Sequence, residues 1–254
     1  AAKALLGKVY LTFHKWNEAK NVLSQLIGKY SLLPSIGQVF DVNNKNNAEI
    51  IFAVHFNKDI VNEGHSYWYD ITNLTDESGQ ADALVNCFTP GDTRKEMITY
   101  VKAESKAYLM TKFLDTKNVS FNQVGNDQIL LRYADVLLMY AEALNELGYD
   151  ASEGSIALKQ LNAIRTRAGL TELTAADVPT QESFRKAILD ERQKEFPYEG
   201  HRWFDFVRMG YAKSVLATQG LNIQDYQLLF PIPQTEIEKV GNPDILWQNP
   251  GYDK

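Results

Sequence analysis

Apolar residues recur at helical spacing in several stretches of the chain, and this pattern predicts a mainly helical protein. Near the N-terminus the spaced apolar positions are Leu5, Val9 and Phe13, followed by Val22, Leu23 and Leu26. Two such runs, separated by polar residues around Lys15, predict a helical hairpin over residues 1–29. A second hairpin is predicted over residues 130–166, and a further helix over residues 181–196, where Pro197 ends it.

The chain between the two hairpins has a different character, since it is rich in Asn, Asp, Gly, Thr and Tyr. Residues 57–127 are expected to form a loop-rich excursion with little regular structure. The segment EIIFAVHF, residues 49–56, is the one convincing strand, and QLLFPIP, residues 227–233, is a second candidate. Another helix is predicted over residues 200–219. The expected fold class is all-α, a single helical domain over residues 1–254 with minor β structure.

The N-terminal hairpin fits the tetratricopeptide (TPR) pattern. In Leu6-Gly7-x-x-Tyr10 the small residue lets two antiparallel helices approach closely, and the aromatic side chain fills the gap between them. Lys3 stands where the motif usually has tryptophan, and a weaker copy of the pattern begins at Leu137. Two units are fewer than the about three that a free-standing solenoid needs, so other elements must close the core.

Composition and charge exclude several classes of protein. The 254 residues carry a net charge of −6 and 44% of them are hydrophobic, which is typical of a globular chain and argues against nucleic acid as a partner. Cys87 is the single cysteine and the four histidines share no ligand spacing with it, so no disulfide, metal ion or other cofactor is expected. No apolar stretch approaches the roughly 18 residues of a membrane span. The first residues lack the features of a secretory signal, so the protein is either cytosolic or has lost its beginning.

Residues 188–206 gather acidic and basic side chains with a histidine, but their spacing favours a structural role. Glu191 and Lys194 are placed for an ion pair on a helix surface. Arg192 and Arg202 are expected to pair with carboxylates where helices meet. No catalytic residue is predicted in this segment or elsewhere in the chain.

The strongest candidate for a binding site is the segment of residues 62–82. It contains three consecutive aromatic residues, and because neighbouring side chains of a helix or strand point to different sides, at least one should be exposed. A flat aromatic face beside short polar groups suits a sugar, whose ring stacks while its hydroxyls form hydrogen bonds. The expected ligand-binding residues are Tyr67, Trp68, Tyr69, His65, Asn73 and Asp76. In the alternative interpretation, Trp68 fills a gap between this loop and the helices.

Several motifs, by their order and spacing, resemble the SusD/RagB family of outer-membrane nutrient-binding lipoproteins. They are AEIIFAV (48–54), GDTR (91–94), ILLRYADVLLMYAEALNE (129–146), LNAIRTRAGL (161–170), ILDER (188–192), EGHRWFD (199–205), LFPIPQTEI (229–237) and NPGY (249–252). Thr93 stands where the family more often has proline. The resemblance covers only about the C-terminal half of a typical member, so the N-terminal part of the family, with its signal peptide and lipid-bearing cysteine, is expected to be missing.

The resemblance implies a binding protein and not an enzyme. Members of the family capture an oligosaccharide or similar nutrient on the extracellular face of the outer membrane of Gram-negative bacteria. They deliver it to a SusC-like TonB-dependent transporter, and they are held at the membrane by a lipid anchor that is absent from this chain. Binding in such proteins comes from variable loops, which points to the excursion of residues 57–127.

Two other functions fit parts of the sequence. The repeat hairpins could grip a peptide, as in a TPR-type protein-interaction scaffold. A glycoside hydrolase is the third possibility, because such enzymes use a pair of carboxylates and the aromatic residues are flanked by Glu63, Asp70, Asp76 and Glu77. Binding of a soluble oligosaccharide would favour the nutrient-binding function, and release of reducing sugar would favour the hydrolase.

Overall fold

The structure, a computed structural model of the 254-residue chain, describes residues 1–65, 84–102, 107–113, 115 and 124–252. The chain divides into two compact units, residues 1–199 and residues 200–254. Helices are the main elements of both units, which confirms the predicted fold class. None of the helices in the described ranges is long and apolar enough to span a membrane.

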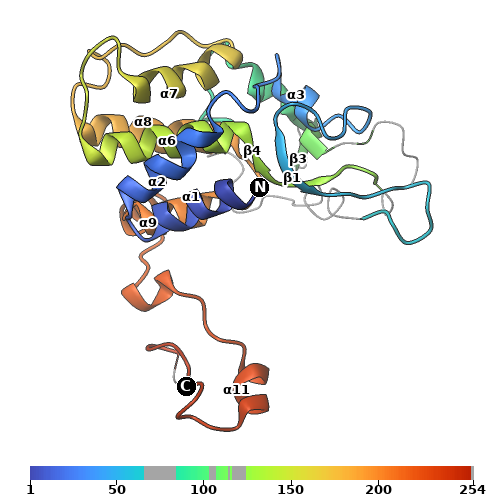
Figure 1. Ribbon diagram of the computed structural model, residues 1–254. Coiled ribbons are helices and arrows are strands. Elements are labelled where there is room, and N and C mark those ends of the chain that lie inside the picture. Colours follow the sequence, from blue (N-terminus) through green and yellow to red (C-terminus); the bar gives the residue numbers. More distant parts are fainter. Residues whose placement is uncertain (66–83, 103–106, 114, 116–123, 253–254) are drawn as a thin grey trace. The chain divides into compact units, whose positions relative to one another are not determined.

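The first unit is built around one central helix. Among its described residues the helices include α1 (Ala2–Thr12), α2 (Trp16–Leu23), α3 (Ile36–Val39), α6 (Tyr133–Leu147), α7 (Ile156–Arg167) and α8 (Gln181–Glu195). Figure 1 shows α6 between α7 on one side and α2 with α1 on the other. Side chains of α6 are buried almost all round, including Leu137, Leu138 and Met139. A helix with so little polar surface must be covered on several sides, which explains its central position.

The close approach of α1 and α2 depends on Gly7. Gly7 is buried in α1, and a Cβ atom added to it would lie 2.4 Å from Cδ2 of Leu23, a residue with no exposed surface. Ala4 and Ala19 are also fully buried in these two helices. Gly7 therefore has the role that the repeat pattern assigns to its small residue.

We expect Gly7→Ala to lower the free energy of unfolding by about 1–3 kcal/mol, because overpacking of a buried contact outweighs the gain in helix propensity. Gly37→Ala is the matched control, since Gly37 lies in α3 and its added Cβ meets no heavy atom within 4 Å. Urea unfolding followed by circular dichroism measures both variants. An unchanged midpoint for Gly7→Ala would contradict the tight contact between α1 and α2.

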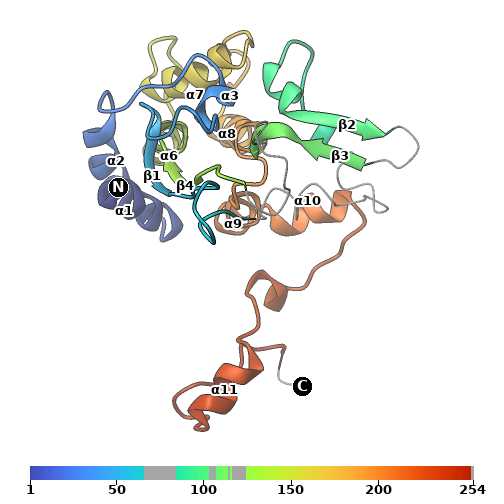
Figure 2. The same cartoon turned by 90° about the vertical axis from the view of Figure 1, so that its right-hand side faces the viewer.

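Short antiparallel strand pairs accompany the helices. β1 (Ile50–Val54) pairs with β4 (Gln128–Arg132), with Ile50 opposite Arg132 and Val54 opposite Gln128. β2 (Ile98–Lys102) pairs with β3 (Ala107–Met110), and Figure 2 shows these two strands side by side. β1 confirms the strand predicted over residues 49–56. The other three strands are not predicted by the sequence, and β4 takes up residues assigned there to the start of a helix.

A smaller apolar cluster packs α3 against β4. Its buried members are Ile36, Val39, Phe40, Met97, Phe113, Val124 and Ile129. Phe40 and Phe113 meet edge to face, with 5.2 Å between their ring centroids. Through Ile129 this cluster fixes β4 to the body of the first unit.

The second unit contains α9 (Arg202–Arg208), α10 (Ala212–Thr218) and α11 (Gln234–Val240). The single helix predicted over residues 200–219 is wrong, because Gly210 has a positive φ of 76° and lies between α9 and α10. The strand predicted over residues 227–233 is also wrong, because Asp225–Leu228 forms a 3-10 helix. Pro231, further along this segment, has no N–H to donate to a neighbouring strand.

Candidate functional site

The strand pair β1/β4 runs from a buried cluster of charges to an open hollow. Glu49 precedes β1 and Arg132 ends β4, so the antiparallel register brings them to the same end of the pair. His55 and Phe56 follow β1 and Asp127 precedes β4, at the opposite end. The two strands therefore hold the charge cluster and the hollow at a fixed separation.

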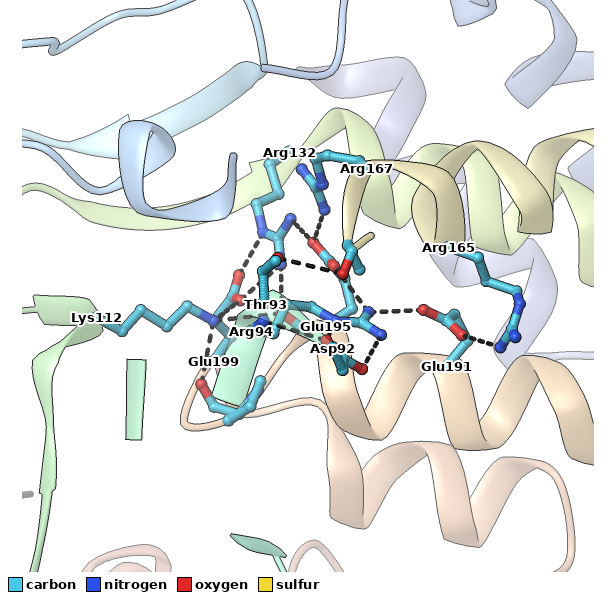
Figure 3. A network of polar contacts seen from close by, with 12 residues as sticks. Asp92, Thr93, Arg94, Lys112, Arg132, Arg165, Arg167, Glu191, Glu195 and Glu199 are labelled. Carbon is cyan, nitrogen blue, oxygen red and sulfur yellow. Dashed lines mark hydrogen bonds and ion pairs between the residues drawn. The ribbon is translucent and has the colours of Figure 1, made fainter. Parts of the chain in front are cut away.

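The buried charges form one network around Arg132 and Glu195 (Figure 3). Arg132 donates to Glu49 Oε1 at 3.0 Å and to Glu195 Oε1 at 2.5 Å. Its Nε atom donates to Glu199 Oε2 at 2.7 Å, and Arg167 also binds Glu49 and Glu195. Burial alone would raise the pKa of Glu195, but the surrounding arginines outweigh it and hold that pKa well below its usual range.

Arg94 joins the same network from a tight turn. Its Nε and Nη2 atoms donate to the two carboxylate oxygens of Asp92, both at 2.8 Å, and Nη1 donates to Glu191 Oε1 at 2.6 Å. The predicted surface ion pair of Glu191 with Lys194 is wrong, because the Glu191 side chain is 1% exposed and pairs with Arg94 and Arg165. The network thus links this turn to α7 and α8.

Two further contacts complete the buried set. Arg192 donates to Asp135 Oδ1 at 2.8 Å, which confirms the predicted pairing of Arg192 and joins α8 to α6. Lys112 pairs with Glu199, yet burial still lowers the pKa of Lys112 to about 8. The side chains at the centre of this network are almost fully buried, so its role is to hold the fold together and it offers no surface to a ligand.

The hollow at the other end of the strand pair is the candidate ligand site. Its lining residues are Lys45, Asn46, His55, Phe56, Asn57 and Glu63. Its volume of about 500 Å³ falls within the range of common small-molecule pockets, about 300–1,000 Å³. The lining combines amides, an imidazole, an ammonium group, a carboxylate and an aromatic ring. It therefore offers hydrogen-bond donors, acceptors and an apolar face.

Asp127 is buried beside the hollow and its carboxylate binds three of the residues that line it. Its side chain is 4% exposed, and Oδ1 accepts hydrogen bonds from Lys45 Nζ at 2.7 Å and from the Phe56 amide at 3.2 Å. The Nδ1 atom of His55 lies 2.7 Å from Oδ2. Because a carboxylate only accepts, Nδ1 carries a proton and Nε2 is the ring atom that could contact a ligand hydroxyl. The His55 side chain is 56% exposed and open to such a ligand.

The backbone around the hollow contains unusual conformations. Asn46, in the lining, has a φ of 54°, and Asn62, next to Glu63, has a φ of 67°. Asparagine is one of the few residues besides glycine that tolerate this left-handed region. The Asn57 amide donates to the carbonyl of Glu63 at 2.8 Å and closes the loop between them. These two asparagines therefore shape the loops around the hollow.

Of the predicted ligand-binding residues the structure describes His65, which lies next to Phe56 of the lining. His65 forms a bridge with Val124, its Nε2 atom lies 2.8 Å from the carbonyl oxygen of Asn126, and its ring meets Phe56 with 4.5 Å between centroids. His65 therefore supports Phe56. The predicted residues outside the described ranges are Tyr67, Trp68, Tyr69, Asn73 and Asp76. Their segment follows His65 directly in the chain.

Sequence reasoning missed Lys45, His55 and Asp127. Lys45 and Asp127 are 82 residues apart, and no local pattern connects them. A histidine at the end of the alternating segment EIIFAVHF is the one sequence signal that could indicate the hollow.

A second cavity, of about 130 Å³, lies among residues of α6, α7 and α8. It is lined mainly by apolar side chains such as Leu144, Leu158 and Phe184. It is smaller than most ligand pockets, and its polar members Asn145, Asp150 and Ser155 already form hydrogen bonds within the protein. Among the described residues, no group of three or more His, Cys, Asp or Glu side chains is placed to hold a metal ion.

These features, together with the order of the sequence motifs, define a family. The SusD family model matches residues 99–252, more than half of the chain. The protein belongs to the SusD family, as the resemblance predicts.

Individual relatives agree with this assignment. SusD-like protein P25 of Formosa agariphila is 28% identical over 97% of this chain and 57% of its own length. The surface glycan-binding protein A from Bacteroides fluxus has a similar structure, with a TM-score of 0.79 and 26% identity over 99% of this chain and 62% of that one. A laminarin binding SusD-like protein has a TM-score of 0.74 and 27% identity over the same shares. The chain thus spans less than two thirds of the length of these relatives.

Proposed function

We propose that this protein captures a glycan at the cell surface without cleaving it, and delivers it to a SusC-like TonB-dependent transporter. One observation carries the proposal. A hollow rich in hydrogen-bonding side chains is followed, a few residues along the chain, by the aromatic run of residues 67–69, in a protein similar to a laminarin binding SusD-like protein.

The lining of the hollow has the chemistry that a sugar needs. Asn46 and Asn57 can each donate and accept hydrogen bonds, as sugar hydroxyls do, and Phe56 provides an apolar ring for a CH-rich sugar face. Asp127 and His65 hold the wall in place before a ligand arrives, which reduces the entropy lost on binding.

We assign the aromatic segment to the same site. Tyr67, Trp68 and Tyr69 would supply a stacking platform, with His65, Asn73 and Asp76 as hydrogen-bonding partners. The single-domain organisation of residues 1–254, with TPR-like hairpins over 1–29 and 130–166 and a ligand-binding excursion over 57–127, remains part of this proposal.

The carboxylates around the hollow favour binding over hydrolysis. Glycosidases flank the scissile bond with two carboxyl groups, one of which must give up or take up a proton. In the described lining Glu63 is the one carboxylate, and the neighbouring Asp127 is engaged by Lys45 and His55. Relatives of similar structure are named as glycan-binding proteins, in agreement with a non-catalytic role.

The cellular setting is proposed from the family. We place the protein on the extracellular face of the outer membrane, held by a lipid anchor and bound to its transporter. Purification of the full-length lipoprotein in mild detergent should recover the transporter with it. Recovery of the protein alone, with normal glycan uptake in a strain that lacks it, would contradict this part of the proposal.

A glycan array probed with the full-length protein tests the binding function. We expect at least one oligosaccharide to bind, and titration calorimetry of that oligosaccharide should show binding with no release of reducing ends on long incubation. A protein that binds no glycan would contradict the proposed function. Accumulation of reducing ends would instead assign it to the glycoside hydrolases.

A further inference from the structure

The lysines of the hollow's wall are neutralised by buried carboxylates. Lys45 Nζ lies 2.7 Å from Asp127 Oδ1, and it also donates to the carbonyl of Phe56 at 2.5 Å. Lys58, on the adjoining loop, lies 2.9 Å from Asp115, whose side chain has no exposed surface. A cation paired in this way adds little attraction for an anionic ligand, because the nearby carboxylate cancels most of its field.

Among the described residues of the lining and its adjoining loop, the remaining charges are negative. Glu63 lines the hollow and is exposed, and Asp59 is exposed on the same loop. The described part of the hollow therefore presents a surplus of negative charge to a ligand.

We infer that the site takes neutral glycans and discriminates against glycans that carry carboxylate or sulfate groups. This inference rests on the proposed function and narrows its substrate class. A neutral sugar needs hydroxyl-directed hydrogen bonds, which Asn46, Asn57 and His55 can supply. An acidic sugar would bring its negative charge close to that of Glu63. In the described lining the lysine is Lys45, and because it is paired with Asp127 it adds little attraction for that charge.

The discrimination should depend on ionic strength. Repulsion between exposed charges is felt over about 30 Å at 0.01 M salt but over only about 3–10 Å at 0.1–1 M. We expect a neutral oligosaccharide to bind about tenfold more tightly than its acidic counterpart in low salt, and the ratio should approach one in high salt.

The experiment uses matched pairs of oligosaccharides on the full-length protein. The glycan array first compares neutral glycans with uronate-bearing and sulfated ones. The best neutral binder is then oxidised at its primary hydroxyl groups to carboxylates, and both forms are titrated by calorimetry at the same pH, in low and in high salt.

Variants assign the effect to this hollow. Glu63→Gln should reduce the ratio of the two affinities from about tenfold to about threefold, because the nearest carboxylate is removed. Glu18→Gln is the matched control, since Glu18 is an exposed residue of α2 and its replacement changes the net charge equally. The control should leave the ratio unchanged.

The outcomes separate this inference from the proposed function. Neutral hits on the array, a salt-dependent ratio and a response to Glu63→Gln alone would support it. Tighter or equal binding of the acidic form, or hits confined to acidic glycans, would overturn the inference while glycan binding stands. Equal responses to Glu63→Gln and Glu18→Gln would also overturn it, because the effect would then come from net charge. A protein that binds neither form would fail the proposed function itself.

Discussion

Arg132→Met is expected to lower the free energy of unfolding by about 3–5 kcal/mol, the range for loss of one partner from a buried ion pair. Methionine keeps much of the length of the side chain, so the loss comes mainly from the charge. The substitution leaves Glu199 and Glu195 buried with fewer compensating donors, since Arg132 binds both and is itself 1% exposed. Chemical denaturation followed by fluorescence or circular dichroism measures the change.

Arg185→Met is the matched control for this prediction. Arg185 lies on α8 and donates through Nε and Nη2 to the two carboxylate oxygens of Glu146, both at 2.7 Å, but its side chain is 23% exposed, so solvent screens this pair more than it screens those of Arg132. Its replacement should therefore lower the free energy of unfolding by less than Arg132→Met does. If Arg132→Met fails to fold, Arg132→Lys takes its place, because lysine keeps the charge but loses the forked guanidinium geometry. Its free energy of unfolding should lie between those of the unmodified protein and Arg132→Met. Equal effects of Arg132→Met and Arg185→Met would contradict the importance of burial in this network.

Trp68→Ala is expected to weaken glycan binding by about 2 kcal/mol, or roughly thirtyfold in Kd, with Tm nearly unchanged. The reason is that an aromatic anchor in a binding site contributes through contact with the ligand, whereas truncation of an exposed side chain changes the folded state little. Titration of the bound oligosaccharide, with a thermal melt of the same sample, measures both quantities.

Trp247→Ala provides the comparison for Trp68, because it removes a tryptophan outside the proposed site, in the second unit. Its Kd should equal that of the unmodified protein. A large fall in Tm for Trp68→Ala would show that Trp68 packs in the core, as the alternative interpretation holds. An unchanged Kd would remove the aromatic segment from the binding site.

Local signals account for the elements that the sequence predicts well. α8 begins at Gln181 after Thr180, which forms a capping box with Ser183, and it ends at Glu195, two residues before Pro197. Both ends of this helix are determined by residues next to them in the sequence, so they can be predicted without the tertiary structure. The prediction of this helix is correct to within one residue.

Strand β4 shows where local reasoning fails. Its apolar residues Ile129, Leu130 and Leu131 continue into the apolar run of α6, and a short buried strand cannot be told from a helix by periodicity alone. This segment is a strand because it pairs with β1, which lies far away in the chain. Short strands of this kind become visible only when the chain is folded.

The same limit applies to the charges and to the hollow. Arg94 and Glu191 are 97 residues apart, and sequence spacing alone suggests a surface position for Glu191. Asp127 likewise acquires its role only through distant Lys45 and His55. The sequence alone indicates the aromatic segment, because its three aromatic residues are contiguous. It does not indicate the hollow, whose lining residues come from separate segments of the chain.

The β1/β4 pair also bears on how such a protein can change over generations. Its charged end makes the contacts on which folding depends, whereas Asn46, Asn57 and Glu63 at its other end are exposed. Substitutions of Asn57 or Glu63 would change the lining of the hollow with little effect on stability, whereas the left-handed backbone of Asn46 restricts the residues that can replace it. Related proteins could thus come to bind different ligands through substitutions in the lining of the hollow, while the buried charge network and the fold stay the same.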